Sequence, residues 1–87
     1  MIMNETQIKI RNVIIKAKNL NLKPEEIKGE NIIKELGISS VDALEILIGI
    51  ENEFDITIND EDLSQELVAS CDNLEQYINK QKAAHAV

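Results

Sequence analysis

Two adjacent serines, Ser39 and Ser40, precede a predicted helix and are the most informative candidates for chemistry in this sequence. Only one of them can be the N-cap, and Ser39 fits because Asp42 follows three residues later, which is the spacing of a capping box. Ser40 then takes the first helical position, where its hydroxyl faces solvent beside backbone N–H groups without intrahelical acceptors. A phosphate ester on Ser40 would lie at the positive end of the helix dipole, so Ser40 is suited to carry a phosphorylated group.

Catalysis by the protein itself is disfavoured by its residue types. The single cysteine, Cys71, excludes an internal disulfide and a cysteine-based metal cluster. The single histidine, His85, lies in the C-terminal tail and is poorly placed as a base for a nucleophile. The spacing of a calcium-binding loop is approached by Asp55, Thr57, Asn59, Glu61 and Glu66, but Asp60 stands where that loop needs glycine. We therefore expect no catalytic residues and no specific metal site.

The acidic residues are concentrated in one part of the chain, within residues 35–79, which contain no lysine or arginine. The acids there are Glu35, Asp42, Glu45, Glu51, Glu53, Asp55, Asp60, Glu61, Asp62, Glu66, Asp72 and Glu75. This surface could simply keep the protein soluble, or it could dock basic proteins along the helix that begins at Ser40. The complete absence of bases favours docking, and the net charge of −7 argues against a nucleic-acid partner.

The elements that must position these residues are predicted to be helices of a single small domain. The chain has 87 residues, of which 44% are hydrophobic and only 2% aromatic, so its core must be aliphatic. Apolar spacing predicts helices over residues 6–19 and 40–54, a short helix over 59–66, and a last helix that Ser70 caps and that fades at Lys80. Residues 20–39 are predicted as a long loop. The fold class is therefore all-α, a small four-helix bundle over about residues 5–80, with 81–87 as a flexible tail.

The helical pattern also predicts which individual side chains face solvent, pack in the core or cap a helix. The bases of the first helix, Arg11 and Lys18 among them, are left for solvent, and Val41 is expected to pack in the core. Asn59 and Asp62 have the spacing of a second capping box. Gly49 in mid-helix costs about 1 kcal/mol relative to alanine, and close approach of a partner would explain it.

The residues around Ser40 resemble the prosthetic-group segment of acyl carrier proteins. Residues 35–45, ELGISSVDALE, resemble the family pattern D-L-G-x-D-S-L-D-x-x-E, and residues 51–58, ENEFDITI, resemble E-x-E-F-x-I-x-I. The resemblance extends to KPEEI at residues 23–27 and to Tyr77-Ile78 in the last helix. Order, spacing, helix count and acidity agree over residues 8–79.

The resemblance implies that a phosphopantetheinyl transferase attaches 4′-phosphopantetheine from coenzyme A to Ser40. The thiol of that arm would carry acyl groups as thioesters to fatty-acid or related biosynthetic enzymes, so the chain would be a carrier and not an enzyme. Asp42 and Glu45 match acidic family positions that meet basic partners. Ile48, Gly49 and Glu53 are expected to continue that partner-binding face of the helix.

Departures from the family pattern indicate a specialised carrier: Ser39 replaces the acid before the modified serine, Asn59 replaces a proline, and Cys71 replaces a valine. Two alternatives remain open at this point, an aminoacyl or polyketide carrier and an acidic helical interaction module without a prosthetic group. The sequence has no secretory signal and no apolar run of membrane-spanning length. We therefore expect a cytoplasmic monomer that does not insert into membranes.

Overall fold

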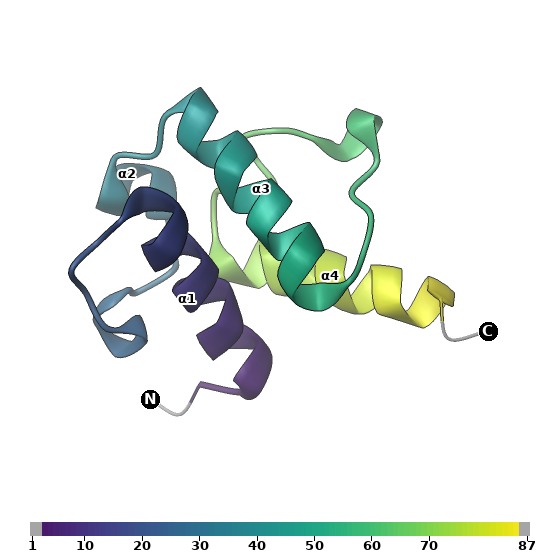
Figure 1. Cartoon of the computed structure of the whole chain (residues 1–87), viewed down its shortest axis with the longest axis horizontal. Coiled ribbons are helices and arrows are strands. Elements are labelled where there is room, and N and C mark those ends of the chain that lie inside the picture. Colours follow the sequence, from purple (N-terminus) through teal and green to yellow (C-terminus); the bar gives the residue numbers. More distant parts are fainter. Residues whose placement is uncertain (1–2, 86–87) are drawn as a thin grey trace.

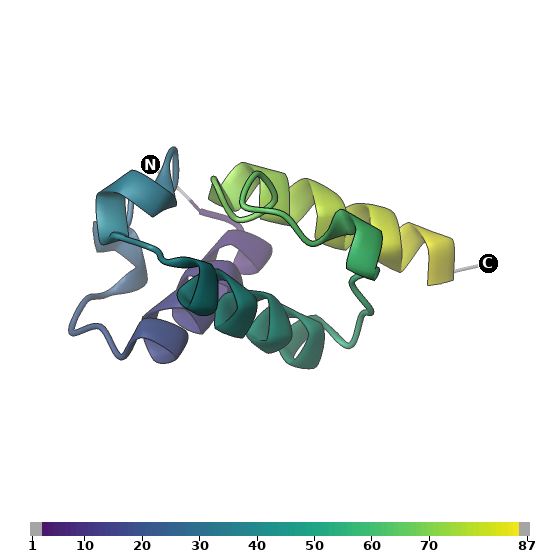
Figure 2. The ribbon, with the colours of Figure 1, turned by 90° about the horizontal axis from the view of Figure 1, so that it is seen from above.

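The computed structural model describes residues 3–85, and over that range the regular elements are all helical (Figure 1). The α-helices are α1 (Glu5–Lys18), α2 (Ile32–Leu36), α3 (Ser40–Phe54) and α4 (Cys71–His85). Two 3₁₀ turns, η1 (Pro24–Glu26) and η2 (Asp60–Asp62), lie in the connections. Viewed from above, α4 lies on one side and α1 and α3 on the other (Figure 2). The prediction of an all-α, four-helix fold is confirmed.

The long helices α1 and α3 begin and end close to their predicted positions because local signals define both ends. Asn4 caps α1 by accepting a hydrogen bond from the Gln7 N–H at 2.8 Å. Asn19 ends α1 in the left-handed conformation, with φ of 54°. Helix α3 has the predicted bounds, and Asp55, with φ of 53°, ends it in the same way.

The prediction that residues 20–39 form an uninterrupted loop is wrong, because η1 and α2 form within this segment. Asn31 caps α2 by accepting from the Lys34 N–H, and Gly37 ends the helix with φ of 65°. Ile32 is fully buried, and its N–H donates to the Ala69 carbonyl at 2.9 Å. The connection is therefore fixed to the core before the chain reaches Ser40.

The predicted short helix over residues 59–66 is also wrong, since only the single turn η2 forms there. The expected capping box is absent from this turn: the Asp62 N–H donates to the Asn59 backbone carbonyl. The Asp62 carboxylate instead accepts from the Tyr77 hydroxyl at 2.8 Å. This bond ties the connection to α4, and a longer helix is not needed to hold it.

Helix α4 begins as predicted, with the Ser70 hydroxyl accepting from the Asn73 N–H at 3.0 Å. The prediction that it fades at Lys80 is wrong, because the helix continues to His85. The residues after Lys80 include glutamine, lysine and alanine, which favour helix. The Lys82 ammonium also lies 5.2 Å from the centre of the Phe54 ring. Residues 86–87 of the expected tail lie outside the described residues.

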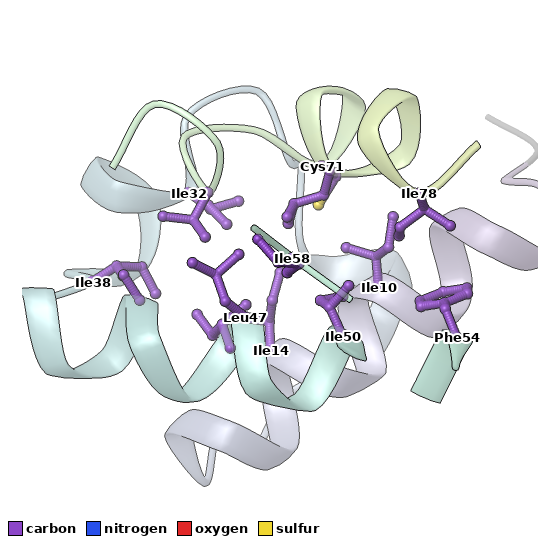
Figure 3. Packing of buried hydrophobic residues seen from close by; sticks show 14 of the residues in the cluster. Ile10, Ile14, Ile32, Ile38, Leu47, Ile50, Phe54, Ile58, Cys71 and Ile78 are labelled. Atoms are coloured by element: carbon purple, nitrogen blue, oxygen red, sulfur yellow. The ribbon is translucent and has the colours of Figure 1, made fainter. Parts of the chain in front are cut away.

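The helices meet around an aliphatic core (Figure 3). It draws Ile10 and Ile14 from α1, Ile46, Leu47, Ile50 and Phe54 from α3, and Cys71, Leu74 and Ile78 from α4. The connections add Ile27, Ile32, Ile38, Ile56, Ile58 and Val68. Among the described residues, no helix is both long and apolar enough to cross a bilayer.

The expectation that Arg11 faces solvent is wrong, because this side chain is only 4% exposed. Its guanidinium donates to the carbonyls of Ile27 and Lys28, each at 2.9 Å, and to Gln7. Gln7 in turn donates to the carboxylates of Asp72 and Glu75 on α4. Arg11 therefore links α1 to the following connection and, through Gln7, to α4.

Candidate functional site

The candidate attachment residue, Ser40, is exposed at the first position of α3. The predicted capping box beside it is confirmed. The Ser39 hydroxyl accepts from the Asp42 N–H at 3.1 Å, and the Asp42 carboxylate accepts from the Ser39 N–H at 3.0 Å. Ser39 is thus committed to the cap, whereas within the described range 3–85 the Ser40 hydroxyl has only a long contact, 3.5 Å, with the Gln65 side-chain amide.

The first turn of α3 suits an anion on the Ser40 hydroxyl. Within residues 3–85, the backbone N–H groups of Ser40 and Val41 have no hydrogen-bond acceptor. Unpaired N–H groups at the start of a long helix attract phosphate oxygens, as does the positive end of the helix dipole. The local geometry therefore fits a phosphodiester on Ser40.

An apolar pocket of about 180 Å³ opens beside Ser40. Its walls come from α3 and from the connection that follows η2: Ala43, Leu44, Leu47, Leu63, Ser64 and Gln65. The sequence did not predict this pocket, because its pattern places residues 63–65 inside a helix. The irregular path of that segment leaves the pocket open next to the serine.

The carboxylate of Asp42 has a second partner that the sequence did not predict. The Lys18 ammonium, at the end of α1, lies 2.9 Å from this carboxylate and 3.3 Å from the Gly37 carbonyl. The Ser39 N–H and then Lys18 lower the pKa of Asp42 from 3.8 to about 2. The expectation that Lys18 is left for solvent is wrong, and Asp42 is engaged inside the molecule.

Helix α3 exposes an apolar strip beside the site. Val41 is 67% exposed, Leu44 50% and Ile48 49%. The prediction that Val41 packs in the core is wrong, because that position faces outward at the start of the helix. Glu45 and Glu53 are also exposed, and among the described residues their carboxylates make no hydrogen bond or ion pair. Exposed apolar side chains and the carboxylates of Glu45 and Glu53 therefore lie together on α3.

The glycine at position 49 is explained by helix packing within the chain. A Cβ atom at this position would lie 2.7 Å from Cγ1 of Val13, so the missing side chain lets α1 pack closely against α3. The two helices border a groove of about 360 Å³. The groove brings together four of the predicted partner-binding residues, Glu45, Ile48, Gly49 and Glu53, and does not include Asp42.

Comparison with known proteins places most of this chain in one family. Residues 9–78 match the family model described as the phosphopantetheine attachment site. An acyl carrier protein of Karelsulcia muelleri is 37% identical over 78 residues, 90% of each chain. Another, from Syntrophobacter fumaroxidans, is 35% identical over 79 residues, covering 90% of this chain and 93% of its own. One from Buchnera aphidicola is 41% identical over 61 residues, covering 69% and 75%.

Proposed function

Because the chain belongs to the acyl carrier protein family, whose phosphopantetheine attachment domain spans most of it, we propose that Ser40 carries its 4′-phosphopantetheine group. The observation that carries this assignment is the difference between the two adjacent serines. Ser39 is held in the capping box, while Ser40 is exposed in the first turn of α3. Members of this family are carriers and not catalysts, and the group supplies a thiol that holds acyl chains as thioesters.

The chain's own residues would present the arm and shelter what it carries. The N–H groups of Ser40 and Val41, which have no acceptor within residues 3–85, would attract the phosphate of the arm. The pocket lined by Ala43, Leu47 and Leu63 would receive the first part of an apolar chain, since its walls are mainly aliphatic. We propose that the cargo is an acyl group passed between biosynthetic enzymes.

Intact-mass measurement tests the assignment. After incubation with coenzyme A and a broad-specificity phosphopantetheinyl transferase, the native chain should gain one phosphopantetheine. The variant S40A should gain none, whereas S64A, a matched control at the same pocket, should be modified like the native chain. Modification of S40A, or a peptide map that places the group on Ser39, would show the assignment to be wrong.

We further propose that partner enzymes bind α3 through Ile48 and the apolar strip, with basic groups meeting Glu45 and Glu53. The support is that these carboxylates are exposed and have no internal partner among the described residues. Electrostatic attraction of this kind mainly accelerates encounter and is weakened by salt.

Single charge removals test this docking surface. The variants E45Q and E53Q should each lower the transferase kcat/KM at low salt, and high salt should remove the difference. E61Q is the matched control, because Glu61 is exposed in η2 and lies outside the groove. An equal loss in E61Q would assign the effect to net charge and would rule out a localised surface.

A further inference from the structure

We infer that Lys18 is a specificity-determining residue, which cancels the negative charge of Asp42 next to Ser40 and so directs basic partners to Glu45 and Glu53. The inference rests on the proposed attachment at Ser40. The evidence for it is the ion pair between the Lys18 ammonium and the Asp42 carboxylate, which lie 2.9 Å apart. Among residues 3–85, no other acid of the segment 35–79 forms an ion pair.

The capping box does not depend on Lys18. Both hydrogen bonds of the box join Ser39 and Asp42. The Ser39 N–H donates to the Asp42 carboxylate, and the Asp42 N–H donates to the Ser39 hydroxyl. Loss of the Lys18 ammonium would therefore leave the start of α3 capped, and the main change would be electrostatic. The pair is partly accessible, with the Lys18 and Asp42 side chains 19% and 25% exposed, so a partner's cation near Ser40 would sense it.

The position of Lys18 in the fold gives this charge its effect. The segment 35–79 has no base of its own, and Lys18 brings one to it from the end of α1. A cationic surface approaching Ser40 then meets a neutral pair at Asp42, while the unpaired carboxylates of Glu45 and Glu53 lie farther along α3. Placement of charge on a docking surface governs encounter rate and partner choice.

The test compares K18M with K9M in the transferase assay. Lys9 is a matched control because it is also an ion-paired lysine of α1, bound to Glu5 at 3.3 Å. K18M should raise kcat/KM by about two- to fivefold at low salt, mainly through a lower KM, since an accessible charge pair has an effect of that order. High salt should abolish the gain, K18R should behave like the native chain, and K9M should change little.

A charge cycle separates electrostatics from structure. D42N keeps an oxygen that can cap Ser39 but leaves Lys18 unpaired, so it should be slower than the native chain. The double variant K18M/D42N should return close to the native rate. A rate for K18M that is unchanged or reduced at every salt concentration would overturn the inference. Absence of any modification of the native chain would instead reject the proposed function, and the inference with it.

Discussion

At the scale of single residues, the proposed attachment site combines signals that are local in the sequence with one that is not. The capping box could be predicted, because Ser39 and Asp42 are three residues apart and the motif is defined by that spacing. The Lys18 contact could not be predicted, because it joins residues 24 positions apart that only the packing of α1 on α3 brings together. The pocket beside Ser40 depends on tertiary packing for the same reason.

Loss of the cap hydroxyl should lower stability without removing Ser40, the proposed attachment residue. S39A should reduce the free energy of unfolding by about 1 kcal/mol, whereas S39D should stay close to the native value because aspartate is also a good N-cap. Urea denaturation of the unmodified proteins measures both. Equal losses in S39A and S39D would mean that the serine hydroxyl does more than cap the helix.

The carboxylate of Asp42 should make stability depend on pH in the acid range. Its pKa is lowered in the folded chain from 3.8 to about 2 by the Ser39 N–H and Lys18. A lowered pKa stabilises the fold above the unfolded value, and that contribution is lost as pH falls from about 4 towards about 2. NMR titration of the carboxyl group and unfolding at each pH should show this, and D42N should have a shallower acid dependence.

At the scale of elements, the sequence predicted the long helices better than the short ones. Helix α3 has both a sustained apolar pattern and a capping box, so its bounds followed from sequence. Helix α2 is only five residues long, too short for a periodic pattern, although Asn31 and Gly37 do mark its ends. Residues 59–66 have the spacing of a cap, but the Tyr77 hydroxyl binds the Asp62 carboxylate, which a local pattern cannot foresee.

The close contact of α1 with α3 predicts a reversal of the usual effect of replacing a helical glycine. G49A should gain about 1 kcal/mol of helix propensity. It should nevertheless be destabilised, by about 1 kcal/mol net, because the new Cβ would lie 2.7 Å from a methyl group of the stiff Val13 side chain. Thermal unfolding of G49A, V13A and V13A/G49A checks this. The double variant should be more stable than V13A, and additive losses would contradict the explanation.

At the scale of the whole molecule, half of the acids in residues 35–79 serve the fold. Their carboxylates accept internal hydrogen bonds: Glu35, Asp42, Glu51, Asp62, Asp72 and Glu75. Six others are exposed and accept none from the described residues: Glu45, Glu53, Asp55, Asp60, Glu61 and Glu66. Composition revealed the acidic segment, but only the structure separates its structural carboxylates from those that can meet a partner.

Repulsion among the six exposed carboxylates should make added salt stabilising. Screening should raise the melting temperature by a few degrees, since about 1 kcal/mol shifts the Tm of a domain this small by roughly 4–8 °C. Calorimetry across a sodium chloride series measures the slope. The variant D60N/E61Q should have a shallower slope, and a Tm that falls with salt would show that attractive pairs dominate instead.

The buried Arg11 side chain has a consequence for the time course of folding. Its bonds to Ile27 and Lys28, and the bonds of Gln7 to α4, all require segments distant in sequence to have arrived. Such contacts should form after the folding transition state, so their loss should affect the rate of unfolding more than that of folding. R11M should therefore unfold faster in stopped-flow experiments while its refolding rate stays close to native. The lifetime of the folded chain would then depend on one buried side chain that lies far from Ser40 in sequence.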